Sequence, residues 1–284
     1  MTIAITVDVE DWFQVENLRH AFPVDSWPKQ QYRVERNVDF ILDALDANDA
    51  KATFFVLGIL AERFPGLVKK ISERGHDVES HGYGHIMLTE MPEPAAFTDL
   101  QKSKRILEDL TGNRVRGYRA PSFSITDRAL EMLAELEYEY DSSVHEFGLH
   151  DRYGKVNTMR FTKYAGTAWR HDSGVLEFPL PMLKVLGIRM PWAGGGYFRL
   201  MPKKLFLMGV KAFLRENAQY VFYMHPWEID PEQPRVKSLP KLNYFKHYYG
   251  LSGAADKLNA LLKLDTIQPI SAGFVDYLVR AQSA

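Results

Sequence analysis

The 284-residue chain contains no cysteine. This absence excludes disulfide bonds, cysteine-based zinc sites and thiol nucleophiles, so a bound metal ion must be held by His, Asp or Glu. The sequence also has no apolar run close to the ~20 residues that a membrane-spanning helix needs. We therefore expect no transmembrane segment.

The chain also lacks an excess of charge of either sign. Its 35 Lys and Arg residues and 36 Asp and Glu residues give a formal net charge of −1. The overall charge therefore gives no support for a nucleic acid or an anionic membrane as a partner. The first residues have neither the basic region nor the cleavage site of a signal peptide, and we expect a cytoplasmic location. The oligomeric state is left open.

What the sequence does contain is a regular alternation of apolar strands and amphipathic helices. We predict strands over 2–8, 52–57, 76–80 and 116–120 and from 138, with helices over 35–48, 59–74, 94–111 and 127–136. This alternation predicts βα units and a mainly parallel sheet. Because polar residues recur at the carboxyl ends of the strands, a (β/α) barrel or an open doubly wound sheet is expected.

The pattern becomes less regular after residue 150. We predict short strands within 147–201, a helix over 202–216, a strand over 219–224, a proline-rich loop over 231–240 and two helices within 252–281. No clear linker interrupts the chain. We therefore predict one domain over 1–284, with a core of 1–227 and a helical extension, 228–284, packed on it.

Two histidines follow the strand that ends at residue 80. His81 and His85 lie four residues apart, and the glycines between them favour a loop over a helix. Imidazole is the commonest protein ligand for divalent transition metals, but such a pair also arises often by chance. The pair therefore needs a carboxylate partner, and Asp8, Glu10 and Asp11 at the end of the first strand are the candidates.

Two further polar residues end other strands. Arg119 would keep a neighbouring carboxylate ionised, unless it is a surface arginine. His225 could donate a proton to a leaving group, although on spacing alone a core histidine bonded to the backbone explains its position better. Nearby aromatics could stack on a sugar ring, but aromatics at such positions more often belong to the core; they are Tyr83, Phe123, Trp192 and Trp227.

Taken together, four ordered motifs resemble those of the NodB-like polysaccharide deacetylases. They are Asp8 within TVDVED, HGYGH over 81–85, RAPSF over 119–123 and YMHPW over 223–227. The wider pattern is similar to the exopolysaccharide-locus subfamily of these enzymes. That similarity adds TVDVEDWFQVE at the start of the chain, HDRYG over 150–154, GGGYFR over 194–199 and HPWEID over 225–230.

The resemblance implies a distorted (β/α) barrel with fewer than eight regular strands. It implies a hydrolase that removes N-acetyl groups from an amino sugar in a polysaccharide or glycan intermediate, with a divalent metal, zinc being the expected ion. Carried over to this chain, Asp8 is the general base, His225 the general acid and Arg119 the tether of Asp8. His81 and His85 are metal ligands, and the substrate-binding residues are Tyr83, Pro121, Phe123, Trp192, Tyr197 and Trp227.

The chain departs from the family pattern in two places. The usual adjacent aspartates are replaced by Asp8-Val9-Glu10, so we predict that Glu10 is the acidic ligand. Asp8 and Glu10 share a strand face, whereas Asp11 points the other way. The family's aspartate–tryptophan motif is not evident, and Asp141 is the nearest acid. The alternatives are an amidohydrolase of a small cyclic amide or ureide, and a catalytically silent glycan-binding module.

Overall fold

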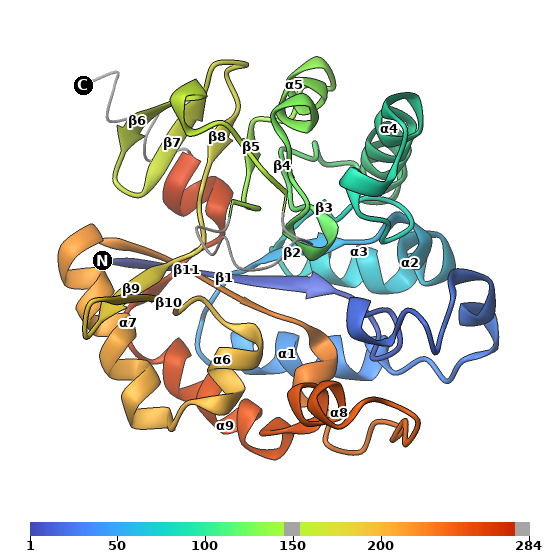
Figure 1. Cartoon of the computed structure of the whole chain (residues 1–284), viewed down its shortest axis with the longest axis vertical. Coiled ribbons are helices and arrows are strands. Elements are labelled where there is room, and N and C mark those ends of the chain that lie inside the picture. The colour runs from blue at the N-terminus through green and yellow to red at the C-terminus, as the bar shows by residue number, and fades with distance from the viewer. Residues whose placement is uncertain (145–153, 276–284) are drawn as a thin grey trace.

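The computed structural model of the chain describes residues 1–144 and 154–275. Its central feature is a mainly parallel sheet with helices packed around it (Figure 1). Among the described residues, ten strands form this sheet in the order β11-β1-β2-β3-β4-β5-β8-β7-β6, with β12 beside β1. The strands are β1 (Thr2–Val9), β2 (Thr53–Val56), β3 (Asp77–Ser80), β4 (Gly117–Tyr118), β5 (Tyr140–Asp141), β6 (Phe161–Ala165), β7 (Ala168–His171), β8 (Leu176–Glu177), β11 (Gln219–Met224) and β12 (Thr266–Ile267).

Strand β1 lies at the centre of the site-bearing part of the sheet. It runs parallel to β11 on one side and to β2 on the other, and Thr6 is aligned with both Tyr223 and Thr53. From β11 to β8 every pairing is parallel, whereas β8, β7 and β6 form antiparallel pairs. The predicted α/β fold is confirmed. The described strands do not close into a ring, in agreement with a distorted barrel.

The helices cover this sheet with their apolar faces. They are α1 (Val34–Asp46), α2 (Gly58–Arg63), α3 (Pro65–Glu73), α4 (Glu93–Thr111), α5 (Asp127–Glu135), α6 (Gly195–Leu200), α7 (Lys203–Asn217), α8 (Lys241–Tyr248) and α9 (Leu251–Leu262). A separate antiparallel hairpin is formed by β9 (Met182–Val185) and β10 (Ile188–Pro191). Because β1 is buried from Ile3 to Val9, it forms the spine of the core.

Three helical predictions need correction. The helix expected over 59–74 is two helices, because Phe64 leaves the helical conformation and Pro65 starts α3 at a position where a missing N–H costs little. Helix α6 lies within 147–201, where only short strands are predicted, and no helix is predicted over α8. The exposed apolar side chains of Leu242 and Phe245 in α8 do not give the stripe that marks a buried helix face.

The described part of the C-terminal region packs on the sheet. Strand β12 pairs with β1, and Leu258 and Leu261 of α9 belong to the largest hydrophobic core cluster. Of the two helices expected within 252–281, α9 is present and a short π-helical turn spans Ser271–Val275; residues 276–281 lie outside the described residues. No described helix is both long enough and apolar enough to cross a membrane.

Candidate metal centre

The structure brings Glu10, His81 and His85 together at the carboxyl ends of β1 and β3. The Glu10 Oε1 atom lies 3.1 Å from His81 Nε2 and 2.9 Å from His85 Nε2. The candidate ligand atoms of the three residues all lie within 4.8 Å of one another, and all three side chains are buried. Two neutral nitrogen donors and one carboxylate match the ligand sets of catalytic zinc sites, which leave a coordination position open.

The hydrogen bonds around His81 fit a bound cation. Its Nδ1 atom lies 2.8 Å from the backbone oxygen of Arg119, which can only accept a hydrogen bond, so Nδ1 carries the proton. In neutral His81 the lone pair on Nε2 then faces the Glu10 carboxylate, and two acceptors meet. A positive charge between them, a proton or a metal ion, resolves this conflict. Outer-shell partners of this kind orient histidine ligands in metal sites.

Helix α4 holds the backbone of the histidine loop. The Asp99 carboxylate accepts hydrogen bonds from the backbone N–H groups of Tyr83 and Gly84, at 2.8 and 3.3 Å. The Ser103 hydroxyl donates to the Gly82 carbonyl at 2.9 Å. His85 has a φ of 54°, a conformation that a non-glycine residue keeps only when its surroundings enforce it.

Asp11 is directed away from the two histidines. Its carboxylate accepts hydrogen bonds from the backbone N–H groups of Trp12, Arg33 and Val34, the last two at the start of α1. Burial raises the pKa of Asp11 to about 6, against the lowering effect of these hydrogen bonds. Asp11 therefore stabilises the turn between β1 and α1, and Glu10 is the acid that lies beside the histidines.

Asp8 and Arg119 form a fully buried ion pair beside this cluster. Arg119 Nη1 donates to Asp8 Oδ1 at 2.8 Å and to the Thr6 hydroxyl at 2.6 Å. The rest of the guanidinium binds the backbone oxygen and hydroxyl of Ser142. The predicted tether between Arg119 and Asp8 is thus present in the structure, and it leaves Asp8 Oδ2 facing His225 at 4.0 Å.

His225 closes the other side of the cluster. Its Nε2 atom lies 3.9 Å from Glu10 Oε1 and its Nδ1 atom lies 3.5 Å from Glu228 Oε2. Burial would lower the pKa of His225, but the carboxylates of Glu10, Glu228 and Asp8 outweigh it and raise the pKa to about 9. The imidazole is therefore held in its protonated form, as a proton donor requires.

Sequence reasoning missed the carboxylate that orients His225. Glu228 lies in a 3₁₀ turn, η6 (Pro226–Ile229), where its side chain accepts the His225 backbone N–H and pairs with Arg199 Nε at 2.9 Å. The spacing of three residues within HPWE was the available signal. Asp141, the acid that the sequence analysis named, lies at the end of β5. Its carboxylate accepts hydrogen bonds from the backbone N–H and the hydroxyl of Ser143.

Two of the predicted substrate-binding aromatics are core residues. Trp192 is 4% exposed, stacks on Phe206 of α7 and donates its indole N–H to the Phe206 carbonyl. Trp227 is 5% exposed and its ring is stacked between those of His225 and His247. Both predictions of sugar contact are corrected. Trp227 instead holds the plane of the His225 ring.

Three other predicted substrate contacts, Tyr83, Pro121 and Tyr197, lie in different places around the cluster. Tyr83 donates its hydroxyl to Glu62, and Lys102 lies 3.4 Å over its ring, so this ring is directed toward α2 and α4. Pro121 is buried against the histidine loop. Tyr197 is half-buried on α6.

Phe123 is the predicted aromatic best placed beside the site. It is half-buried and packs edge-on against Tyr223, whose ring in turn contacts His225. Ser122 and Phe123 have φ values of 52° and 57°, so this segment is strained close to the site.

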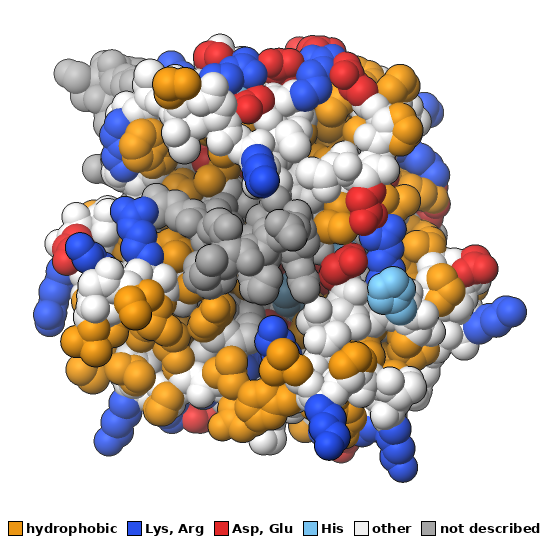
Figure 2. Space-filling view, in the orientation of Figure 1, with side chains coloured by type: hydrophobic (Ala, Val, Ile, Leu, Met, Phe, Trp, Pro, Cys, Tyr) orange, Lys and Arg blue, Asp and Glu red, His pale blue; other side chains and the backbone are white. Residues whose placement is uncertain are grey.

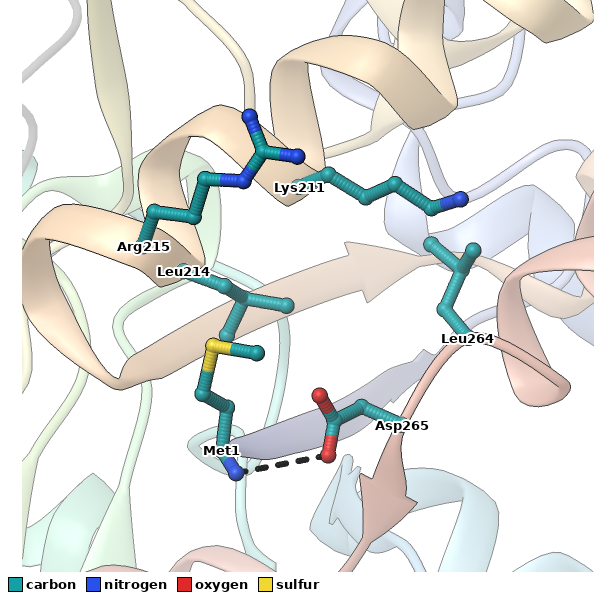
Figure 3. Close-up of a pocket in the computed structure, with 6 residues that line it drawn as sticks. All are labelled: Met1, Lys211, Leu214, Arg215, Leu264 and Asp265. Carbon is teal, nitrogen blue, oxygen red and sulfur yellow. Dashed lines mark ion pairs between the residues drawn. The ribbon is translucent and has the colours of Figure 1, made fainter.

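A separate pocket of about 160 Å³ lies far from this cluster. Figure 3 shows its lining, in which the Met1 amino group pairs with Asp265 at 3.4 Å beneath Lys211 and Arg215 of α7. Met1 precedes β1, whereas Asp8 lies near the carboxyl end of that strand and Glu10 directly follows it. The pocket is thus at the opposite end of the sheet from the metal cluster.

The comparisons with known proteins agree with this geometry. Residues 22–140 match the family model described as polysaccharide deacetylase, and residues 142–271 match a domain of unknown function (DUF3473). A peptidoglycan-N-acetylglucosamine deacetylase of Bacillus cereus is 36% identical over 98 residues, which are 34% of this chain and 36% of that protein. A chitin deacetylase of Arthroderma benhamiae is 32% identical over 103 residues, 34% of this chain and 28% of that protein.

The structural similarity extends over nearly the whole chain. A Mycobacterium smegmatis protein provisionally assigned as a polysaccharide deacetylase superposes with a TM-score of 0.63 at 19% identity, over 99% of this chain and 91% of that one. A peptidoglycan N-acetylglucosamine deacetylase bound to an N-hydroxybenzamide gives a TM-score of 0.52 at 19% identity, over 96% and 87%. At these identities the likeness supports the fold. The family model and the sequence relatives show that residues 22–140 are similar to polysaccharide deacetylases.

Proposed function

We propose that this chain is a metal-dependent N-deacetylase that acts on an N-acetylated amino sugar in a polysaccharide or glycan intermediate. The observation that carries the proposal is the meeting of three groups within about 4 Å: the Glu10–His81–His85 cluster, the Asp8–Arg119 pair and the His225–Glu228 pair. A metal ligand set, a base and an acid in one place are what amide hydrolysis needs.

The residues of the chain have separate parts in this reaction. When bound, a divalent ion polarises an amide carbonyl and lowers the pKa of a water ligand toward ~7. Asp8 is held by Arg119 through Oδ1, so Oδ2 is in place to accept the proton of the attacking water. His225 is on the opposite side of Glu10 from the histidine loop and donates its proton to the nitrogen of the leaving amine.

The proposed ion is zinc. A set of two histidines and one glutamate is typical of catalytic zinc sites, and the chain has no cysteine that would direct the ion elsewhere. Purified protein with about one zinc per chain would support this assignment.

The proposed substrate class rests on the relatives, whose printed activities are on peptidoglycan N-acetylglucosamine and on chitin. Because the matched segment spans only about a third of those proteins, the substrate is a proposal for this chain. The finer proposal is a polymer of the exopolysaccharide type. It is supported by TVDVEDWFQVE, GGGYFR and HPWEID; of HDRYG, residues 150–153 lie outside the described residues.

The direct test is release of acetate from N-acetylated glucosamine oligosaccharides by the zinc-loaded protein. A His81→Ala/His85→Ala variant is the negative control, and allantoin serves as a small cyclic ureide. Acetate release that requires the two histidines is expected. Turnover of the ureide alone would replace the proposal by a small-amide hydrolase. Binding of the oligosaccharides without any turnover would replace it by a silent glycan-binding module.

A further inference from the structure

The net charge of −1 conceals a strongly basic stretch in the second half of the chain. Residues 178–215 contain seven Lys and Arg residues and no Asp or Glu. This stretch forms the β9–β10 hairpin, α6 and nearly all of α7. Arg199 is buried against Glu228 and Lys203 pairs with Asp256, so the cations that remain at the surface are the ones that can attract anions.

The tip of the hairpin presents large apolar side chains to solvent. Leu186 is 98% exposed and Ile188 is 67% exposed. Leu186 and Gly187 form the two-residue turn between the paired Val185 and Ile188, with φ values of 49° and 86°. Asn, Asp or Gly usually occupies the first position of such a turn. Leu186 therefore buries almost no apolar surface within the chain, and its left-handed conformation is unfavourable for a leucine.

Helix α7 continues this surface. The residue that follows the hairpin is Trp192, whose indole packs against Phe206 and Gly209 of α7, so the two elements lie side by side. Leu205 and Met208 of α7 are 48% and 66% exposed. Figure 2 shows hydrophobic side chains gathered over the hairpin and α7 at the lower left, with Lys and Arg around them.

The cations of α7 are on the same outward side as these apolar residues. Lys204, Lys211 and Arg215 follow one another at spacings of seven and four, which places them on one helix face. All three are exposed, and none forms an ion pair with a residue in the described parts of the chain. Lys184 adds a further exposed cation on the hairpin.

We propose that the hairpin tip and the outer face of α7 form a docking surface for an anionic lipid bilayer. Cations combined with exposed leucine, isoleucine and methionine suit an interface in which the apolar groups enter the headgroup region and the cations meet lipid phosphates. A nucleic acid would satisfy the cations but not Leu186 and Ile188. A second copy of the chain would bring its own exposed cations, Lys184, Lys204, Lys211 and Arg215, against those of the first.

The docking surface is connected to the candidate active site. The segment that follows the hairpin reaches Gly194, which pairs with Tyr223 of β11, two residues before His225. A β-carbon on Gly194 would lie 1.8 Å from the Tyr223 oxygen, so this approach of the two backbones is close. Docking through the hairpin would therefore hold β11 and His225 at a fixed position relative to the bilayer.

The test is co-sedimentation of the full chain with vesicles. One set contains phosphatidylcholine alone and the other equal parts of phosphatidylcholine and phosphatidylglycerol. We expect binding to the anionic vesicles, and we expect it to weaken between about 0.1 M and about 0.5 M salt because screening shortens the reach of the cations. The variants are Leu186→Glu/Ile188→Glu for the tip and Lys204→Glu/Lys211→Glu/Arg215→Glu for the helix. Each should lower the vesicle partition coefficient more than about tenfold.

Matched controls carry the same chemistry elsewhere on the surface. Met159→Glu replaces an apolar side chain that is 87% exposed, and Arg105→Glu reverses a charge on α4. Both should bind vesicles like the wild type, and acetate release from soluble oligosaccharides should be unchanged in the docking variants. Failure of the wild-type chain to bind anionic vesicles above neutral ones would overturn the proposal. Equal vesicle binding by the wild type and both docking variants would overturn it too. If the wild type self-associates, the docking variants do not, and neither binds vesicles, the surface is instead a contact between copies of the chain.

Discussion

Glu10 is the residue on which the candidate site depends, because its carboxylate faces three imidazoles. Burial would raise its pKa, but His85, His225 and His81 lower the pKa well below its usual value. The carboxylate is therefore ionised and available as a ligand. Its position at the strand end could be predicted from the period-two alternation of β1, which directs Asp8 and Glu10 to one face and Asp11 to the other.

The first prediction concerns the ligand set. His81→Ala/His85→Ala should remove nearly all bound zinc, because a single carboxylate cannot replace two imidazole ligands. Elemental analysis of the purified protein measures this. The control is His20→Ala, which removes an exposed histidine. Full zinc retention in the double variant would show that the ion is bound elsewhere.

The second prediction separates the base from the ligands. Asp8→Asn should lower kcat by at least about 10²-fold while zinc remains bound, because Asp8 is assigned to proton transfer and Glu10 to ligation. Steady-state kinetics at saturating zinc and elemental analysis together measure this. Near-wild-type turnover in Asp8→Asn would require a different base.

The third prediction concerns Glu228 and the pH dependence. A nearby carboxylate stabilises the imidazolium, so Glu228→Gln should lower the pKa of His225. The acid form is present below this pKa and is lost as the pH rises through it. The basic limb of kcat/KM against pH should therefore move to lower pH in the variant. Glu232→Gln, at an exposed acid nearby, should leave the limb in place. If the basic limb of the pH profile does not move in Glu228→Gln, Glu228 does not set the pKa of His225.

At the scale of elements, sequence patterns predicted the first half well and also found α7 and β11 in the second half, but they missed α6 and α8. Helix α1 and strand β1 follow simple periodicities and were found close to their predicted bounds. Helix α6 was missed because it begins with two glycines, Gly195 and Gly196, which local patterns assign to a loop. Its start is fixed by tertiary pairing of Gly194 with Tyr223, which no local pattern contains.

Arg199 at the end of α6 joins three elements, and a fourth prediction follows from it. Its guanidinium binds Glu228 and the backbone carbonyls of Lys246, His247 and Tyr249 at the end of α8. Arg199→Gln should lower the free energy of unfolding by about 3–5 kcal/mol, because Glu228 is left buried without its partner. Urea unfolding measures this. Arg36→Gln, at an exposed ion pair, should change it by no more than about 0.5 kcal/mol.

At the scale of the whole molecule, one sheet crosses the boundary between the two family models. Strand β5 lies at the end of the first matched region and pairs with β8 of the second. Strand β1 pairs with β11 over six residues, Thr2–Val7 with Gln219–Met224, and with β12. His225 follows β11, so the second region also completes the candidate site. These long-range pairings are what a reading of local sequence could not supply.

The last prediction tests whether the chain is one cooperative unit. A fragment of residues 1–141 would expose the edge of β1 that β11 covers, and it would lack His225. A fragment of residues 142–284 would lack β1, the neighbour of both β11 and β12. We therefore expect the full chain to unfold in a single transition and neither fragment to show one, measured by circular dichroism in urea. An independent core can form only where buried strands keep their neighbours. A cooperative transition in either fragment alone would therefore contradict the prediction and show that the chain contains two domains.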